Sequence, residues 1–215
     1  MSKHILIVGA SRGIGLGLAQ EFKARGWEVT GTERSKSDDL HALDGVNVVT
    51  LDVTDPSTFD IEGEFDAVIV NAGITGAEHQ SSEKATADEV AKVMMTNAFG
   101  PAHLGKTLLP KIRDGGSLSF MSSLMGSIED SSGGYELYRT SKTAQNMLAK
   151  GIAEQDAADR DIAVLSLHPG WVQTDMGGPN AKITVEESAK GLADVVENAQ
   201  PGYAYVDYTG KALPF

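Results

Sequence analysis

The chain begins its first predicted strand and turn with Ile5-Leu6-Ile7-Val8-Gly9-Ala10-Ser11-Arg12-Gly13-Ile14-Gly15. Four consecutive apolar residues are typical of a parallel strand that is covered on both faces. Glycines follow at once, and an amphipathic helical pattern starts at Ile14. A strand, a glycine turn and a helix N-terminus can present backbone N–H groups to a pyrophosphate. We therefore predict a dinucleotide-binding turn, with a tight turn that holds no ligand as the alternative. The expected contacts are Gly9, Ser11, Arg12, Gly13, Ile14 and Gly15.

The same alternation of short apolar runs and longer amphipathic segments continues to the end of the chain. It predicts an α/β protein with a Rossmann-like, doubly wound, seven-stranded parallel sheet. We expect strands at Ile5–Val8, Glu28–Thr32, Asn47–Leu51, Ala67–Val70, Ser117–Met121, Ala163–Leu167 and Tyr203–Val206. We expect helices at Ile14–Ala24, Ala87–Leu109, Tyr135–Gln155 and Val185–Asn198, the second of them kinked at Gly100-Pro101. Polar loops are expected at Ser35–Leu40, Thr75–Thr86 and Gly126–Gly134, and residues 1–215 are expected to form a single domain.

Composition excludes several classes of function. The 215 residues include 18 Lys and Arg against 30 Asp and Glu, a net charge of −12. That balance counts against nucleic acid or an anionic membrane as partner, because both require a clustered positive field. Without cysteine there can be no disulfide, thiolate metal ligand or cysteine nucleophile, and the five His show no metal-ligand spacing. Because Ile5–Val8 is too short for a signal segment and no apolar run could span a membrane, we expect a cytoplasmic protein.

Two adjacent charges at the end of the second predicted strand bear on the coenzyme. An acidic residue such as Glu33 commonly binds the adenosine ribose 2′-OH, whereas an Arg such as Arg34 accommodates a 2′-phosphate. Arg12 could reach the same phosphate, and two guanidiniums should outweigh one carboxylate. The sequence thus favours NADP(H) over NAD(H). Glu33 could instead point outward and pair with Arg34.

Two further strand ends carry candidate cofactor contacts. Asp52, followed by Val53, is suitably located for an adenine amino group, although it could equally cap a short helix. After the fourth predicted strand, Asn71-Ala72-Gly73 offers small residues over which a coenzyme could pass. A plain loop is the alternative for this segment.

A candidate reacting centre follows the fifth predicted strand, which ends in Ser122-Ser123. Tyr138 and Lys142 are four residues apart and therefore share one face of the next predicted helix. A nearby ammonium stabilises a phenolate, so Lys142 is expected to lower the pKa of Tyr138 and make it a general acid.

The ordered set Gly9-x3-Gly13-x-Gly15, Asn71-Ala72-Gly73, Asn97, Ser122/Ser123, Tyr138-x3-Lys142 and Pro169-Gly170 resembles the short-chain dehydrogenase/reductase family. The resemblance runs from Lys3 to Phe215. The segments 138–142, 168–178 and 210–215 are most similar to the C-factor/sniffer-like branch of short carbonyl reductases.

The resemblance implies a role for each matching position. Tyr138 would be the acid/base, and Lys142 would lower its pKa and bind the nicotinamide ribose. Ser123, three residues before Gly126, would hold the substrate carbonyl, with Ser122 as the fallback. Asn97 would anchor a proton-relay water. The carboxamide would be held by the segment that contains Pro169, Gly170, Val172 and Thr174.

These roles predict a reversible hydride transfer between NADP(H) and a small carbonyl or secondary alcohol. The segment Met176–Thr184 is short for a substrate lid and implies an open site. An NAD(P)-binding regulatory or signalling protein with little turnover is the alternative, and a sugar-nucleotide epimerase would need a larger C-terminal part. Apolar residues on more than one side of the 87–109 and 135–155 helices predict a homodimer.

Overall fold

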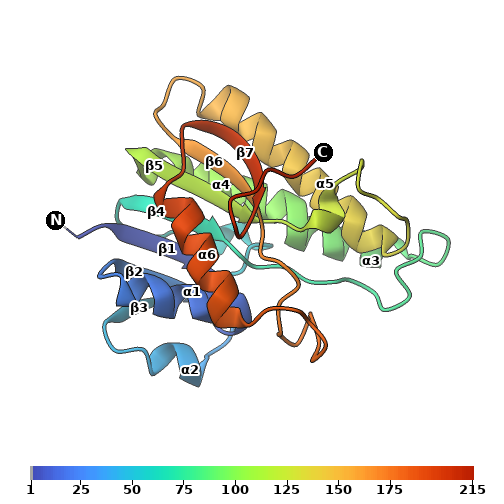
Figure 1. The fold of residues 1–215 in the computed structure, drawn as a ribbon, viewed down its shortest axis with the longest axis horizontal. Coiled ribbons are helices and arrows are strands. Elements are labelled where there is room, and N and C mark those ends of the chain that lie inside the picture. Colours follow the sequence, from blue (N-terminus) through green and yellow to red (C-terminus); the bar gives the residue numbers. More distant parts are fainter. Residues whose placement is uncertain (1) are drawn as a thin grey trace.

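A seven-stranded parallel sheet forms the centre of the computed structural model, which describes residues 2–215 (Figure 1). The strand order is β3-β2-β1-β4-β5-β6-β7. This confirms the predicted doubly wound Rossmann-like sheet. The strands are β1 (His4–Val8), β2 (Glu28–Glu33), β3 (Val46–Thr50), β4 (Phe65–Val70), β5 (Ile112–Met121), β6 (Ala163–His168) and β7 (Gly202–Asp207).

Helices cover both faces of the sheet. On one face α1 (Gly13–Ala24) packs against α6 (Val185–Glu197), and on the other lie α4 (Gly100–Leu108) and α5 (Glu136–Gly151). Strand β1 shows why its sequence is continuously apolar. Ile5 and Ile7 belong to the core beneath α1 and α6, whereas Leu6 and Val8 belong to the core beneath α4 and α5. Alternate residues of a strand thus bury opposite faces.

The remaining elements are short. They are α2 (Asp38–His41), α3 (Ala87–Met94), 3-10 turns at Pro56–Thr58, Leu109–Lys111 and Leu124–Gly126, and π turns at Met95–Phe99 and Ile152–Asp156. Among residues 2–215 no helix is long and apolar enough to cross a membrane.

The predicted 87–109 helix changes its hydrogen-bond pattern immediately before Gly100-Pro101, where the sequence predicts a kink. A π turn at Met95–Phe99 separates α3 from α4. Pro101 comes just after this turn, in a helix that continues through it without a break, and its missing N–H withholds one donor from the preceding helical carbonyls. A Cβ on Gly100 would lie 2.2 Å from the Val53 carbonyl oxygen, so glycine is required for this close approach.

Part of the predicted 35–40 loop is the short helix α2, a correction to the sequence prediction. Ser37 caps it by accepting a hydrogen bond from the Leu40 N–H at 3.3 Å, and Asp38 and Asp39 occupy its first turn. Leu40 is fully buried against the core. One apolar anchor is therefore enough to order a segment whose composition is otherwise that of a loop.

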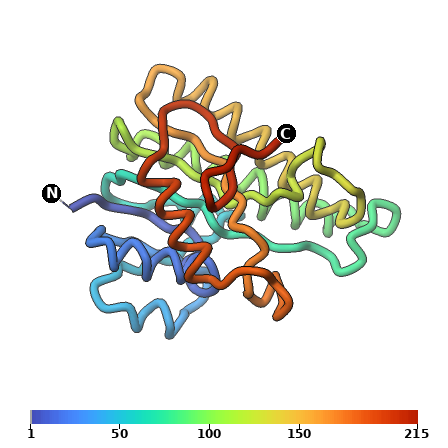
Figure 2. The backbone as a smooth tube through the Cα atoms, in the orientation of Figure 1, coloured from blue at the N-terminus to red at the C-terminus, as the bar shows by residue number. Residues whose placement is uncertain are grey.

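The order in which strands are added to the sheet reverses at β1, which pairs with β2 on one side and with β4 on the other. In Figure 2 the blue and light-blue segments that hold β2 and β3 lie in the lower part of the view, and the yellow-green and orange segments that hold β5 and β6 lie in the upper part. The loops after β1 and β4 therefore separate at the carboxyl edge of the sheet, where open α/β sheets bind their ligands.

Candidate active site

A cleft of about 660 Å³ opens at this carboxyl edge. It collects predicted residues from segments far apart in the sequence. Those that line it are Gly9, Ser11, Arg12, Gly13, Ile14, Arg34, Asp52, Val53, Asn71, Ala72, Gly73, Tyr138, Lys142, Pro169 and Thr174. The predicted residues that do not line it are Gly15, Asn97, Ser123, Gly170 and Val172.

The glycine turn after β1 is tightly packed. A Cβ on Gly15 would lie 2.0 Å from the Gly9 carbonyl oxygen, so Gly15 permits close packing of the turn. Asn71 Nδ2 donates to that same carbonyl at 2.9 Å and joins the ends of β1 and β4. No side chain caps the N-terminus of α1. Its first N–H groups are thus available to an anion in the cleft.

Glu33 faces away from the cleft. Its carboxylate accepts a hydrogen bond from the Ser37 N–H at 2.6 Å and one from His41 Nε2 at 2.9 Å. The His41 bond holds the pKa of Glu33 below its usual value. Glu33 is buried with His41 as its partner, so the expected alternative of an outward pairing with Arg34 does not form.

Two guanidiniums remain at the cleft. Arg34 is exposed at its edge. Arg12 Nη1 lies 2.7 Å from Asp175 Oδ2, and both side chains are about four-fifths exposed. The cleft is thus lined by two arginines, Arg12 paired with Asp175 and Arg34 acting on Asp52, while the Glu33 carboxylate is turned toward His41. A guanidinium without that competing carboxylate is suited to a 2′-phosphate.

Asp52 both lines the cleft and stabilises its own turn. Its Oδ1 accepts hydrogen bonds from the Thr54 N–H at 2.9 Å and the Thr54 hydroxyl at 2.8 Å. Burial raises the pKa of Asp52, but these bonds and the charge of Arg34 outweigh it and keep the pKa below its usual value. Asp52 is therefore an anionic acceptor at neutral pH.

Tyr138 and Lys142 lie close together in the lining of the cleft, and Ser123 is buried behind that lining. Lys142 Nζ lies 5.8 Å from the centroid of the Tyr138 ring. The Ser123 hydroxyl accepts a hydrogen bond from the Met125 N–H at 3.2 Å and acts to lower the pKa of Tyr138, whereas Ser122 Oγ donates to Asn146 Oδ1 at 2.6 Å. Although Ser122 lines the cleft, its hydroxyl is already engaged, and Ser123 is the serine associated with the tyrosine.

The expected lowering of the Tyr138 pKa is not found. Burial raises the pKa of Tyr138 to about 12, against a smaller lowering by Ser123. Lys142 is fully buried, and burial lowers its pKa to about 7. Its Nζ donates to the Met121 carbonyl at 2.7 Å and to Gln145 Oε1 at 3.2 Å. A lysine that is only partly charged at neutral pH stabilises a phenolate weakly.

Asn97 acts on the backbone around the tyrosine. Its amide pairs with Ile74, accepting from the N–H at 2.8 Å and donating to the carbonyl at 2.7 Å. Asn97 Nδ2 also donates to Ser141 Oγ at 2.9 Å, and Ser141 Oγ donates to the Tyr138 carbonyl at 2.8 Å. Asn97, which is buried within the π turn, thereby ties the loop after β4 to α5.

Some residues of the segment after β6 line the cleft, and others lie in the core. Pro169 and Thr174 line the cleft, whereas Val172 is buried and bridges Ile183. Sequence reasoning missed the neighbouring Gln173, Asp175 and Met176, which line the cleft. Other lining residues it missed are Val8, Ser35, Leu51, Ile74, Thr96 and Met121. Asp175 pairs with an arginine 163 residues away, and no local signal in the sequence could reveal that.

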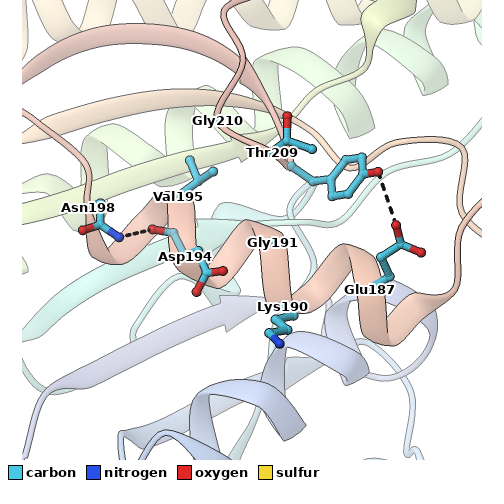
Figure 3. Close-up of a pocket in the computed structure, with 9 residues that line it drawn as sticks. Glu187, Lys190, Gly191, Asp194, Val195, Asn198, Thr209 and Gly210 are labelled. Atoms are coloured by element: carbon cyan, nitrogen blue, oxygen red, sulfur yellow. Dashed lines mark hydrogen bonds between the residues drawn. The ribbon is translucent and has the colours of Figure 1, made fainter.

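A second hollow of about 470 Å³ lies between α6 and the turn after β7 (Figure 3). None of the predicted site residues lines it. Its lining residues are Glu187, Lys190, Gly191, Asp194, Val195, Asn198, Tyr208, Thr209 and Gly210. Over residues 2–215, no three His, Asp or Glu side chains are grouped so that they could hold a metal ion.

The family model described as short chain dehydrogenase matches residues 3–183. The chain is 35% identical over 158 residues to C-signal of Myxococcus xanthus, with 71% of this chain and 94% of that protein covered. A carbonyl reductase from Pseudomonas aeruginosa PAO1, solved in complex with NADP, is similar over 100% of both chains, with 37% identity and a TM-score of 0.90. The carbonyl reductase Sniffer of D. melanogaster is similar over 100% of both chains, with 26% identity and a TM-score of 0.90.

Proposed function

The chain belongs to the short-chain dehydrogenase family, as the sequence predicted, and we propose that it transfers a hydride between NADP(H) and a small carbonyl or secondary alcohol. Its likeness to C-signal and to Sniffer confirms the predicted branch of the family. The observation that carries the proposal is the closeness of Tyr138 and Lys142 in the lining of the cleft, with Ser123 near enough to act on the Tyr138 pKa.

NADP(H) is supported as coenzyme by two independent findings. The Pseudomonas aeruginosa carbonyl reductase was solved in complex with NADP. In this chain, Arg12 and Arg34 border the cleft while Glu33 is hydrogen-bonded to His41. The glycine turn and the uncapped N-terminus of α1 fit a pyrophosphate, and Asp52 fits the adenine. Asn71, Ala72, Gly73, Lys142, Pro169 and Thr174 would hold the rest of the coenzyme.

The protein's own part in the reaction is to orient the substrate and supply a proton. A nicotinamide coenzyme supplies the hydride when it is bound. Ser123 would hold the substrate oxygen, and Tyr138 would donate its hydroxyl proton to that oxygen as negative charge develops. Because the pKa of Tyr138 is about 12, its hydroxyl is protonated at neutral pH. That protonation state suits carbonyl reduction better than alcohol oxidation.

A regulatory or signalling role is the second candidate. The relative named C-signal favours it, since that name denotes a signal. A protein that only binds NADP(H) has no need for Ser123, Tyr138 and Lys142 at one place, and their closeness supports the enzyme. A homodimer and a cytoplasmic location stay predictions of the sequence. Met95, Phe99 and Met147 support the homodimer, because they are exposed on the π turn and α5.

The test is a titration with NADPH and NADH by nicotinamide fluorescence, followed by a screen of small aldehydes and ketones. We expect tighter binding of NADPH and turnover of at least one carbonyl class. Binding without turnover across the screen would favour the regulatory candidate. Absence of binding to either coenzyme would contradict both.

A further inference from the structure

Only two non-glycine residues within 2–215 have positive φ, Gln80 at 52° and Tyr135 at 49°. Such backbone conformations are costly and persist where the surrounding structure holds them in place, often at functional sites. Gln80 lies in the loop after β4, and Tyr135 immediately precedes α5. The two residues are 55 positions apart in sequence, yet both lie at the N-terminus of the helix that carries Tyr138.

Gln80 supplies the N-terminal cap that α5 lacks. Tyr135 offers no side-chain hydrogen bond to the helix. Instead the Gln80 carbonyl accepts from the Glu136 N–H at 3.0 Å, and Gln80 Oε1 accepts from the Tyr138 N–H at 3.0 Å. Two of the helix N–H groups that would have no partner within α5 are thus satisfied by one distant residue.

The Gln80 side chain is itself fixed. Its Nε2 donates to the Thr75 carbonyl at 2.8 Å and to the Ala77 carbonyl at 2.7 Å. The Gln80 amide therefore donates to carbonyls of its own loop through Nε2 and accepts from the Tyr138 N–H through Oε1. A second contact joins the loop to the helix, because Glu136 Oε2 accepts from the Ser82 N–H at 2.5 Å.

These bonds close a ring around the backbone of Tyr138. On the N–H side the ring passes through Gln80 and back along the loop to Ile74. On the carbonyl side it passes through Ser141 Oγ to Asn97, whose amide holds both polar groups of Ile74. Both polar backbone groups of Tyr138 are thereby tied to the loop that follows β4.

We propose that Gln80 is a positioning residue for Tyr138, holding the tyrosine backbone so that its hydroxyl meets Ser123. This inference rests on the proposed function. Gln80 does not line the cleft, so its effect on catalysis must pass through Tyr138. Small displacements of a reacting group, of about 1 Å, can lower turnover by about 100-fold.

Gln80→Gly is the variant of choice. Glycine adopts positive φ without strain and keeps the carbonyl that accepts from Glu136, so the substitution removes only the side chain. Gln200→Gly is the matched control. Gln200 is exposed, and its Nε2 likewise donates to two nearby carbonyls, those of Asn198 and Ala199, remote in sequence from α5.

We expect Gln80→Gly to lower kcat about 10- to 100-fold and to leave the Kd for NADPH within about two-fold, because only Tyr138 moves. Gln200→Gly should change neither. By NMR, the Tyr138 N–H should exchange slowly in the native chain and quickly in Gln80→Gly, and the ring resonance of Tyr138 should shift. Should Gln80→Gly fail to fold, Gln80→Asn tolerates positive φ and shortens the reach, so the same changes are expected.

Three outcomes would overturn the proposal. One is fast exchange of the Tyr138 N–H in the native chain. Another is lost protection in Gln80→Gly with kcat unchanged, which would make Gln80 a purely structural cap. The third is an equal fall in kcat for Gln200→Gly. If the native chain turns over no carbonyl, the proposed function fails. The ring resonance of Tyr138 still tests the positioning role on its own, because a resonance that does not shift in Gln80→Gly would show that Gln80 does not position the tyrosine.

Discussion

The carboxylate of Glu33 accepts a hydrogen bond from His41 Nε2 at 2.9 Å, which turns this acidic side chain toward α2 and away from the cleft. In the sequence, Glu33 stands beside Arg34, and the two suggest opposite coenzymes. The His41 contact holds the Glu33 carboxylate away from the position where it could bind a ribose 2′-OH. Coenzyme choice then falls to the two arginines.

Arg34→Ala should therefore weaken NADPH binding by about 10- to 100-fold and NADH binding by much less. A charge-assisted contact to phosphate is worth about 1.5–3 kcal/mol, and NADH lacks the 2′-phosphate. Glu33→Gln is the companion variant and should leave the preference for NADPH in place. The measurement is fluorescence titration of each protein with each coenzyme. Equal weakening of both coenzymes in Arg34→Ala would show that Arg34 does not contact the phosphate.

Lys142→Met should change how stability depends on pH. The pKa of Lys142 falls from 10.5 to about 7 on burial, so the unfolded chain binds the proton more tightly than the folded one. The native protein thus loses stability as pH falls through this window, by up to about 1.4 kcal/mol per pH unit. Met cannot titrate, so the variant's free energy of unfolding should rise relative to the native protein from pH 10.5 down to 7 and level off below. Urea unfolding at several pH values measures this, and a difference independent of pH would contradict it.

The two directions of the reaction should depend differently on pH. With the pKa of Tyr138 at about 12, the hydroxyl stays protonated well above neutral pH. Carbonyl reduction needs that proton and should be nearly constant between about pH 7 and pH 9. Alcohol oxidation needs the phenolate and should rise across the same range. Steady-state rates in both directions test this, and an oxidation rate that fell with increasing pH would contradict the assignment.

Assembly can be tested with one substitution on α5. Met147 is 76% exposed there, and Ile128 is 71% exposed in the loop before the helix. Light scattering should give twice the chain mass of 22.7 kDa for the native protein. Met147→Asp should reduce it to a single chain, because a buried charge opposes association, whereas Ile128→Asp should not. A native mass near 22.7 kDa at micromolar concentration would contradict the homodimer.

Local patterns in the sequence sufficed for the sheet and for most residues of the cleft. Buried strands read as apolar runs, and the glycine turn and the Tyr138-x3-Lys142 pair are local signals. Contacts between distant side chains carry no such signal. Arg12 with Asp175 and Gln80 with Tyr138 depend on how separate loops meet after folding. The pKa of Tyr138 is raised where the sequence predicted that it would be lowered, for the same reason. Burial of Tyr138 and Lys142 causes both pKa shifts, and burial depends on how the site packs.

Tyr138→Phe is the most direct test of the central claim. The substitution removes one hydroxyl from a residue in the lining of the cleft and leaves the ring and the glycine turn in place. We expect carbonyl turnover to fall by at least about 100-fold, in line with the loss of a general acid, while NADPH binding by fluorescence stays within about three-fold of the native value. Near-native turnover in Tyr138→Phe would contradict the assignment of Tyr138 as the proton donor.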